Sequence, residues 1–277
     1  MTYRLICDSC TDLPAQTWAD PCVRKVPLSI QVGPETVIDD STFRQKELLQ
    51  KMRAWPDAPK TACPAPSTYL DQFSDGADNY VVTLSALLSG SYNAAMQAKA
   101  IYEEEGGTGN VHVFNSRSAV SGQAQIALLV MELAGGGMSF DQVVERVEAY
   151  ISRMKTLFVL ENPDNLRKNG RLTKMQSLIT GALRVKLLCG ATREGEIEKL
   201  GQGLSIRQTL ARMVSRMAED ADHVGRRLII THCNCPERAE HVRELVQKRC
   251  RFGEILITAA GGIATVYAED GGIVAAY

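Results

Sequence analysis

The residues best suited to chemistry follow a predicted buried strand. Residues 80–84 form an apolar run, and Ser89, Gly90 and Ser91 come shortly afterwards, before a predicted helix. The start of a helix offers free backbone N–H groups and the positive end of the helix dipole, and both favour an anion. Gly90 has no side chain, so the backbone there could approach a ligand closely. The segment therefore predicts a carboxylate or phosphate site that needs no arginine or lysine.

Other strand ends support this expectation. Ligands of open parallel sheets bind outside the carboxyl ends of the strands. Three predicted strand exits carry hydroxyl or carboxylate side chains: Asp8-Ser9, Ser85 to Ser91, and Asn115-Ser116. Ser89 and Ser91 could instead serve only as helix caps, a role that serine often fills. Spacing alone does not decide between a ligand site and a pair of caps.

Catalytic motifs are missing from the sequence. No serine lies in a G-x-S-x-G motif, and neither common nucleotide-binding loop follows a predicted strand. A nucleophilic Ser89 would need a base within hydrogen-bond reach, and the sequence nominates none. The four histidines are His112, His223, His232 and His241. We expect a non-enzymatic protein, with an enzyme acting on a small carbonyl or phosphate substrate at the same crevice as the alternative.

Cysteine spacing raises a third hypothesis. Of the eight cysteines, Cys7 and Cys10 form a C-x-x-C pair, while Cys233 and Cys235 follow His232. These residues could bind zinc, or the first pair could be a redox dithiol. Against zinc, Cys7 ends an apolar strand and neither pair has flanking knuckle glycines. The cysteines are therefore expected to pack as reduced thiols, and neither a metal nor a cofactor is predicted.

These polar segments are spaced by a repeating strand, loop and helix pattern, which is typical of β-α-β units and a parallel sheet. Predicted strands lie at 5–7, 23–32, 80–84, 111–114, 156–160, 185–189, 196–200, 228–231, 255–259 and 273–276. Predicted helices begin at Ser41 and Ser67 as caps and follow Tyr92, and others lie at 122–134, 140–155, 172–182, 205–221 and 236–249. A proline-rich loop at 56–66 separates the first two helices.

Length and composition favour a two-domain globular protein. The chain has 277 residues, of which 45% are apolar, and 31 basic residues nearly balance 32 acidic ones. This balance gives no general attraction for nucleic acid, and no apolar run approaches the length of a membrane span. The first residues lack a signal-peptide pattern, so a cytoplasmic location is expected. After residues 156–160 the pattern changes to alternating short strands and basic turns, which predicts domains at 1–155 and 156–277.

Several segments, in order along the chain, resemble the motifs of the DegV family. Residues 8–14 are similar to D-S-x-x-D-L-P, residues 26–28 to V-P-L, and residues 59–66 to P-x-T-S-Q-P-S. Residues 85–95 are similar to S-S-x-L-S-G-T-Y-x-x-A, Asn115-Ser116 stands where the family has D-S, and residues 166–172 are similar to L-x-x-G-G-R-I. Because the order is kept over most of the chain, the combined resemblance is more specific than any single motif.

The resemblance implies a Rossmann-like N-terminal domain and a smaller C-terminal α/β domain with a mixed sheet. It also implies a long-chain fatty acid between the two domains, with its carboxylate held by Thr61 and Ser89. The supporting head-group loops would contain Ala62, Gly90, Ser91, Asp8 and Ser9. Some family members present their fatty acid to a separate kinase that makes acyl-phosphate, so a fatty-acid kinase is an implied partner.

This chain departs from the family pattern near the implied head group. Ala62 and Cys63 replace the serine and glutamine of the threonine loop, and Leu204 replaces an expected arginine. The C-terminal H-x-G-P-G pattern has become Tyr267 to Gly271. Because a cation and an imidazole are the groups best suited to assist phosphoryl transfer, these changes affect the kinase partnership more than fatty-acid binding.

Overall fold

The computed structural model describes residues 2–172 and 186–277. Its N-terminal part is built on a parallel sheet with the strand order β2-β1-β6-β7. These strands are β1 (Tyr3–Asp8), β2 (Val23–Val26), β6 (Asp78–Thr83) and β7 (Val111–Asn115). Side chains alternate between the two faces, so Leu5 and Cys7 join one core cluster and Ile6 joins another. Apolar side chains on both faces explain why the strands appear as short apolar runs in the sequence.

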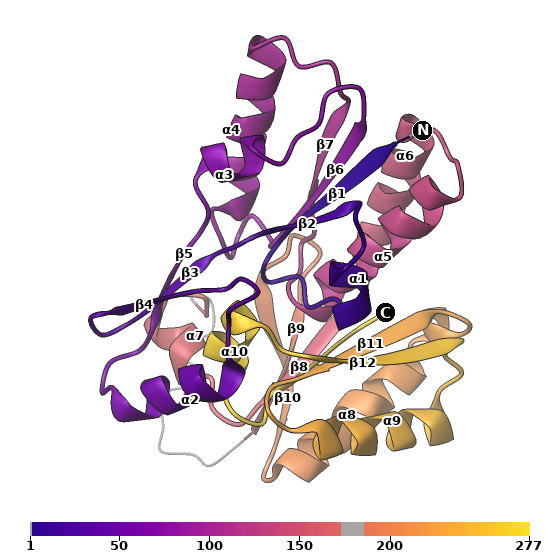
Figure 1. Ribbon diagram of the computed structural model, residues 1–277. Helices are drawn as coiled ribbons and strands as arrows, with labels where there is room; N and C mark the ends of the chain where they lie inside the picture. Colours follow the sequence, from indigo (N-terminus) through magenta and orange to yellow (C-terminus); the bar gives the residue numbers. More distant parts are fainter. Residues whose placement is uncertain (1, 173–185) are drawn as a thin grey trace.

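Helices cover both faces of this sheet (Figure 1). On one face pack α3 (Pro66–Leu70) and α4 (Ser91–Glu104), and on the other α5 (Ser121–Gly135) and α6 (Phe140–Ile151). The short helix α1 (Ala15–Trp18) follows β1. Small residues on α4, including Ala94, Ala95 and Ala98, are buried and bring this helix close to the sheet.

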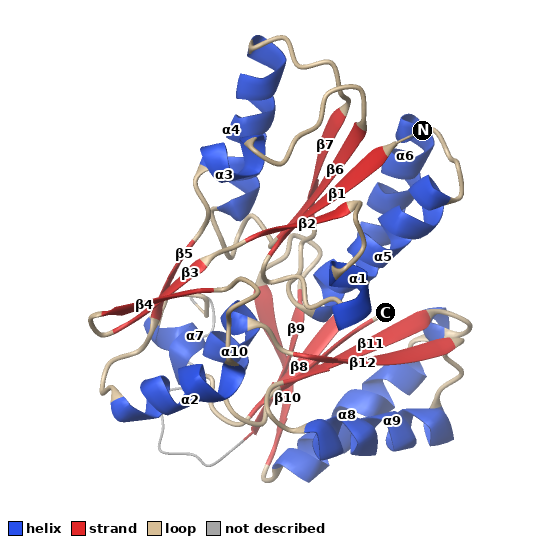
Figure 2. Cartoon of the chain, in the orientation of Figure 1, coloured by secondary structure: helices blue, strands red, loops and turns tan. Residues whose placement is uncertain are grey.

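The C-terminal part contains a mixed sheet with the order β10-β9-β8-β13-β11-β12. The strands are β8 (Thr156–Leu160), β9 (Lys186–Ala191), β10 (Ile197–Gly203), β11 (Arg227–His232), β12 (Glu254–Ala259) and β13 (Ile273–Ala276). Among the described strands of this sheet, only β11 and β12 pair in parallel. The helices α8 (Ile206–Glu219) and α9 (Pro236–Arg249) cover one face, and a 3-10 helix spans Ala221–His223 (Figure 2). The opposite face is directed toward the N-terminal part.

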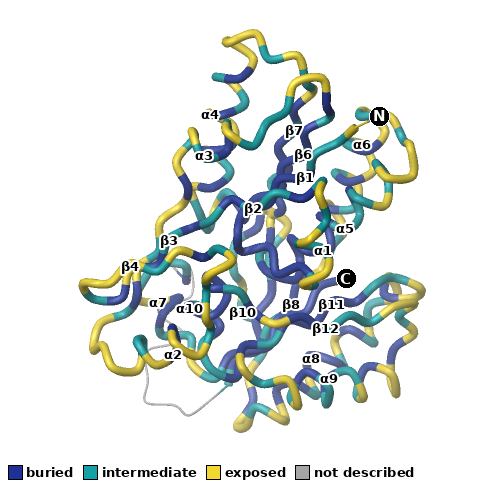
Figure 3. Tube along the Cα trace, viewed as in Figure 1, coloured by how far each residue is buried: buried dark blue, intermediate teal, exposed yellow. Residues whose placement is uncertain are grey.

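A small third sheet, β4-β3-β5, joins the two larger ones. It consists of β3 (Ser29–Val32), β4 (Glu35–Ile38) and β5 (Lys60–Ala62). Beside it lie α2 (Gln45–Ala54), α7 (Asp164–Lys168) and α10 (Gly262–Ala268). Figure 3 shows that the buried segments run continuously through the centre, where the three sheets meet. Thr61 and Tyr267 are both carried by these bridging elements.

The structure confirms the predicted fold class and corrects several local predictions. The extended stretch at 23–32 is two strands in different sheets, because the chain turns at Pro27 and the Leu28 N–H donates to Ser9 Oγ at 3.1 Å. Ser41 and Ser67 do not cap helices: α2 starts after Arg44, and α3 starts after Ala65 with a proline in its first turn. The helix α6 ends at Ile151 rather than Lys155.

Two further predictions concern regions that the structure leaves open. The helix expected at 172–182 falls outside the described residues, except for Leu172, which lies in a turn. All strands of the parallel sheet precede residue 155, and all described strands of the mixed sheet follow it. The division into domains at 1–155 and 156–277 stays a prediction. Within the described residues, no helix is both long and apolar enough to cross a membrane.

Candidate functional site

A largely apolar cavity lies between the parallel sheet and the mixed sheet. It contains about 850 Å³ of space free of atoms, including its part open to solvent. The apolar lining comes from both parts of the chain: Cys10, Leu28, Leu84, Leu88, Ala119, Val120, Phe158, Leu160, Leu166, Ala191, Ile197, Ile263, Ala264, Ala268 and Val274. The polar lining side chains are Thr61, Ser89, Ser118, Thr156, Arg171, Glu196 and Tyr267. A cavity of this composition suits a ligand that is apolar over most of its length.

Thr61 and Ser89 both line this cavity. Thr61 lies in β5, and its hydroxyl is 2.7 Å from the phenol oxygen of Tyr267, which projects from α10. Ser89 lies in the loop before α4 and is half-buried. We call the part of the lining that carries Thr61, Ser89 and Tyr267 the cavity mouth, because Tyr267 contacts Thr61 and because Arg171 contacts both the Tyr267 ring and the Leu88 carbonyl next to Ser89. Sequence separation hides this arrangement, because Thr61 and Tyr267 are 206 positions apart in the chain.

Arg171 places a positive charge at the cavity mouth. Its Nε donates to the Leu88 carbonyl at 3.3 Å, and its guanidinium carbon lies 5.8 Å from the centre of the Tyr267 ring. This side chain also lines the cavity, although the site predicted from strand exits contained no cation. The sequence feature that could have indicated Arg171 is the segment similar to L-x-x-G-G-R-I, which contains it. Because that segment lies in a turn after the short helix α7, a search of strand ends does not find it.

Two buried carboxylates fix the start of α10 and thereby the position of Tyr267. Asp39 accepts hydrogen bonds from Gly262 N at 2.8 Å and Ile263 N at 3.0 Å, and Asp12 accepts one from Gly261 N at 2.9 Å. Burial, followed by the charge of Asp39, raises the pKa of Asp12 well above its usual range. Side chains of the N-terminal part therefore accept hydrogen bonds from the first backbone N–H groups of a helix in the C-terminal part.

Asp8 lies buried behind the cavity mouth and does not line the cavity. One carboxylate oxygen accepts from Cys10 N at 3.1 Å and from Gln123 Nε2 at 2.8 Å, and the other accepts from Leu84 N at 2.7 Å. Burial raises its pKa to about 6, although hydrogen bonds from Gln123, Leu84, Cys10 and Ser91 oppose the shift. Asp8 therefore ties together the ends of β1 and β6 and the starts of α4 and α5.

The predicted serine loop has a cap-like geometry and also faces the cavity. The Ser91 N–H donates to Ser89 Oγ at 3.2 Å, and the two hydroxyl oxygens are 3.1 Å apart. Ser89 lines the cavity, whereas Ser91 is buried behind it. A side chain at Gly90 would meet Cys63 Sγ at 2.8 Å, so the space left by this glycine holds a neighbouring loop. The two interpretations of the serines are therefore compatible.

The remaining predicted loop residues surround the mouth without entering the cavity. Ser9 is buried and accepts from the Leu28 N–H, and Ala62 is exposed at the end of β5. Asn115 Oδ1 accepts from Ala86 N at 3.1 Å, and the Ser116 hydroxyl donates to Ser118 O at 3.0 Å. These contacts hold the loops that carry Ser89 and Ser118.

A second hydroxyl pair lines the cavity at the start of β8, and we call this part of the lining the tail end. Ser118 and Thr156 are buried, and their hydroxyl oxygens are 2.6 Å apart. Thr156 begins β8 and Leu160 ends it, and both line the cavity, so at about 3.3 Å per residue the lining along this strand spans about 13 Å. Beside Thr156, the β9-β10 turn closes against the N-terminal part, where Ser85 Oγ donates to Gly195 O at 2.7 Å.

The cysteine cluster has structural contacts. Cys233 Sγ lies 3.7 Å from Thr265 Oγ1, and Cys235 Sγ lies 3.6 Å from the Gly272 carbonyl oxygen. Within residues 2–172 and 186–277, no group of three or more His, Cys, Asp or Glu side chains is arranged to hold a metal ion. Burial raises the pKa values of Cys7 and Cys10 well above the usual range, which disfavours the reactive thiolate.

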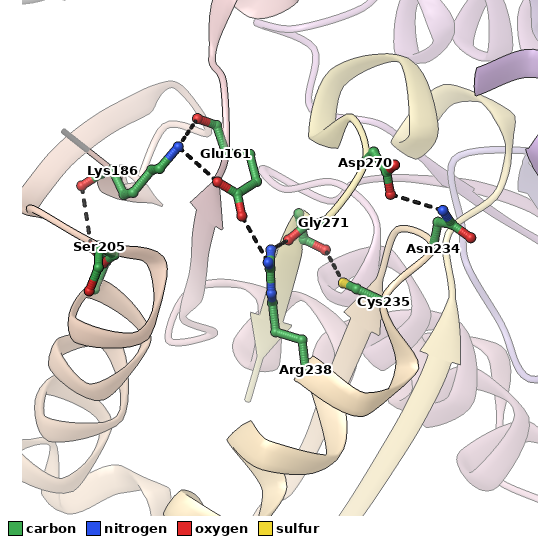
Figure 4. Close-up of polar contacts among 10 residues, drawn as sticks. Glu161, Lys186, Ser205, Asn234, Cys235, Arg238, Asp270 and Gly271 are labelled. Carbon is green, nitrogen blue, oxygen red and sulfur yellow. Dashed lines mark hydrogen bonds and ion pairs between the residues drawn. The ribbon is translucent and has the colours of Figure 1, made fainter. Parts of the chain in front are cut away.

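An ion-pair network near Cys235 holds the loop that precedes β13 (Figure 4). Glu161 pairs with Lys186 at 2.8 Å and with Arg238 at 2.8 Å, and Arg238 also donates to the Gly271 carbonyl. In the same view, Asn234 Nδ2 donates to Asp270 Oδ1 at 2.9 Å. These contacts join β8, β9 and α9 to the segment that follows α10, and so support the helix carrying Tyr267.

Fold and cavity together define an α/β protein with an elongated apolar site that has hydroxyl groups and one guanidinium at its mouth. Residues 2–277 match the family model described as "Uncharacterised protein, DegV family". A DegV domain-containing protein of Streptococcus gordonii is 35% identical over 283 residues, covering 100% of this chain and 99% of the relative. The chain therefore belongs to the DegV family.

Solved structures agree in fold over the whole chain. A DegV family protein of Ruminococcus gnavus ATCC 29149, described with vaccenic acid, has a TM-score of 0.96 and 43% identity, covering 100% of this chain and 99% of that one. The Fatty Acid Kinase (Fak) B3 protein of Streptococcus pneumoniae, loaded with linoleic acid, has a TM-score of 0.90, 31% identity and the same coverage. A DegV family protein of Eubacterium eligens, loaded with heptadecanoic acid, has a TM-score of 0.91, 27% identity, and coverage of 99% and 98%.

Proposed function

We propose that this protein binds one long-chain fatty acid, with the carboxylate at the cavity mouth and the acyl chain along β8. The observation that carries the proposal is an apolar cavity whose lining includes Thr61, Ser89 and Arg171, with Tyr267 in contact with both Thr61 and Arg171. Solved relatives that are described with vaccenic, linoleic and heptadecanoic acids support the same ligand class.

The acyl chain and the carboxylate contribute differently to binding, because water solvates them differently. Burying each methylene contributes about 0.8 kcal/mol, so the acyl chain supplies most of the favourable free energy. The carboxylate must leave water, and it requires hydrogen bonds at its new position. Hydroxyls of Thr61 and Ser89 can donate these bonds, and Arg171 contributes a charge of opposite sign. The hydrogen bond between the Tyr267 and Thr61 hydroxyls holds the Thr61 side chain in place.

Extraction of the purified protein with denaturing solvent, followed by mass spectrometry, tests this proposal. We expect about one fatty acid per chain. A matched preparation of Thr61→Ala/Ser89→Ala should retain much less after the same washing. Recovery of no fatty acid from the wild type, together with no uptake of added vaccenic acid, would contradict the proposal.

We also propose that the loaded protein acts in the cytoplasm and presents its ligand to a separate fatty-acid kinase. The similarity to the Fatty Acid Kinase (Fak) B3 protein supports this role. Leu204, which stands where the family pattern has an arginine, is 81% exposed and offers a kinase no charge. Incubation of the loaded protein with ATP and a bacterial fatty-acid kinase should yield acyl-phosphate. If the kinase converts fatty acid carried by the Streptococcus pneumoniae relative but none carried by this chain, the partnership is refuted.

A further inference from the structure

The helix α7 and the turn after it contact the elements that carry the hydroxyl groups of the cavity mouth. Asn169 Nδ2 donates to the Pro59 carbonyl at 3.0 Å, and Pro59 directly precedes β5, which carries Thr61. Asn165 Nδ2 donates to the Val266 carbonyl in α10 at 2.9 Å. Neither asparagine is among the described residues that line the cavity. Both side chains therefore act on the mouth from outside the cavity.

Asn169 also contacts the cation of the mouth. Its backbone carbonyl accepts a hydrogen bond from Arg171 Nη1, and Arg171 Nε donates to the Leu88 carbonyl at 3.3 Å, next to Ser89. Asn169 thus joins two recognition groups that come from different parts of the chain. Its side chain holds the loop that leads to Thr61, and its backbone holds the guanidinium.

The surroundings of Asn169 determine the orientation of its side-chain amide. Nδ2 lies within hydrogen-bond distance of two carbonyl oxygens, those of Pro59 at 3.0 Å and Asn165 at 2.9 Å. Because a carbonyl oxygen only accepts, the side-chain atom between the two must be the NH₂ group, which supplies one proton to each. An apolar side chain of similar shape would leave both carbonyls without this donor.

The strand β5 gains most from such a contact because it is short. Its three residues pair with β3, and it lies at the end of the sheet with the order β4-β3-β5. A segment with few backbone hydrogen bonds opens more easily than the centre of a sheet. The bond from Asn169 joins this segment to a turn 110 positions away in the chain, and so restricts where Thr61 can lie.

We propose that Asn169 is a positioning residue for the carboxylate site, because it holds Thr61 and Arg171 where one carboxylate can contact both. This inference rests on the proposed function. Asn169 does not contact the ligand; it strengthens binding because the two recognition groups are already in place when the acid enters. The pattern L-x-x-G-G-R-I has glycine at this position, which has no side chain to make the contact with Pro59.

The test variant is Asn169→Leu, since leucine resembles asparagine in shape and offers no donor. Asn169→Gly, which restores the residue of the family pattern, replaces it if the leucine variant does not fold. The control is Asn110→Leu. Asn110 Nδ2 donates to Asp78 Oδ1 at 2.8 Å, at the starts of β6 and β7, whereas the loop that carries Ser89 follows the end of β6. The control therefore loses a side-chain hydrogen bond away from the mouth.

The measurement is calorimetric titration of the delipidated proteins with dodecanoate and with dodecan-1-ol. Asn169→Leu should bind dodecanoate about 2- to 12-fold more weakly than the wild type, which is the effect of one hydrogen bond. Its affinity for the alcohol should change much less, and Asn110→Leu should bind both ligands as the wild type does. In a Thr61→Ala/Arg171→Gln background, the change at position 169 should have little further effect on dodecanoate, because it acts through those two residues.

Carbon-13 NMR of carboxyl-labelled dodecanoate gives a signature that a loss of stability alone would not produce. In the wild type, the bound carboxyl group lies beside Arg171, which favours its ionised form. In Asn169→Leu, the bound carboxyl group should titrate with a higher pKa than in the wild type. Asn110→Leu should leave this pKa unchanged.

The outcomes separate this inference from the proposed function. The positioning role is refuted, while fatty-acid binding stands, if Asn169→Leu binds dodecanoate as tightly as the wild type or loses equal affinity for the acid and the alcohol. Full additivity with Thr61→Ala/Arg171→Gln would refute it as well. If the delipidated wild type binds neither dodecanoate nor vaccenic acid, the proposed function itself fails.

Discussion

At the scale of single residues, the cavity mouth combines side chains with different tasks. Thr61 and Ser89 offer hydroxyl donors, Arg171 offers charge, and Tyr267 links Thr61 to the C-terminal part through a 2.7 Å hydrogen bond. In the family pattern a histidine occurs in the region of Tyr267. Tyr267 supplies a hydroxyl there in place of an imidazole.

Replacing Tyr267 with phenylalanine should weaken fatty-acid binding by about 2- to 12-fold. The variant removes one hydrogen bond, which contributes about 0.5–1.5 kcal/mol, and keeps the ring beside Arg171. Titration of delipidated protein with vaccenic acid measures the change. A control is Tyr92→Phe, which alters a phenol outside the cavity lining. Equal affinities of the Tyr267 variant and wild type would show that the phenol does not organise the mouth.

Replacing Arg171 with glutamine should weaken binding by roughly 10- to 100-fold, because a hydrogen bond to a charged group contributes about 1.5–3 kcal/mol. Binding of an uncharged ligand of the same length, such as a long-chain alcohol, should change much less. Comparison of the two ligands isolates the charge effect. If the alcohol and the acid lose the same affinity, Arg171 shapes the cavity and does not recognise the carboxylate.

At the scale of elements, sequence patterns located most strands and long helices. The residues of β8, α9 and β13 agree with the predicted bounds, because apolar runs and a proline at the first helical position are local signals. The elements that complete the mouth were missed. The three residues of β5 are a strand only because they pair with β3, and α10 is capped by Asp39, which lies 223 residues away.

The candidate-site residues also divide into those that a local sequence signal indicates and those that depend on long-range packing. Ser89 was found through a strand exit, and Thr61 came only from the family resemblance, since nothing local distinguishes a threonine in a proline-rich loop. Arg171 and Tyr267 were not predicted as site residues. Their positions depend on how α7 and α10 pack against the N-terminal part, and a single sequence does not specify such long-range packing.

The contribution of Asp39 to the stability of α10 should be measurable. Asp39→Ala would leave two backbone N–H groups without their acceptor, and we expect a loss of roughly 1–3 kcal/mol in the free energy of unfolding. Denaturant unfolding of the delipidated proteins provides the value. Asp40→Ala is a matched control, because the neighbouring carboxylate accepts hydrogen bonds from Thr42 in its own loop and none from α10 among the described residues. Similar stabilities of the two variants would argue against this role for Asp39.

The tail end should set the preferred chain length. Ala191→Leu adds side-chain volume beside the Ser118 and Thr156 pair, so an acid that reaches this end would lose space for its last carbons. At about 0.8 kcal/mol per methylene, excluding two carbons should weaken binding about 10- to 20-fold. We expect an octadecanoid acid to be affected and dodecanoate to be nearly unchanged. Equal losses for both acids would place the tail elsewhere.

At the scale of the whole molecule, the cavity lies between two sheets, and a titratable side chain, Glu269, directly follows the helix that carries Tyr267. Burial, opposed by a hydrogen bond from Asn165, raises the pKa of Glu269 to about 6. Glu269 directly follows α10 and has a positive φ of 52°, a conformation that favours glycine. Because the pKa of Glu269 is higher in the folded protein than in the unfolded chain, folding favours its neutral form.

The sign of the resulting pH dependence can be tested with Glu269→Gln. Because the folded pKa is raised, the stabilisation is complete below about pH 4.5 and is lost as the pH rises through about 6. The glutamine variant keeps the backbone conformation but cannot ionise. We expect it to gain stability over the wild type between pH 4.5 and 7, measured by thermal unfolding. A stability difference that does not vary with pH would contradict this interpretation of Glu269.

The account as a whole depends on the orientation of the ligand, and a crystal structure of the protein loaded with vaccenic acid tests it most directly. We predict carboxylate oxygens within about 3 Å of the Thr61 and Ser89 hydroxyls, with the acyl chain running along β8 toward Ser118 and Thr156. A carboxylate at the Ser118 and Thr156 end, or an acid bound outside this cavity, would contradict it.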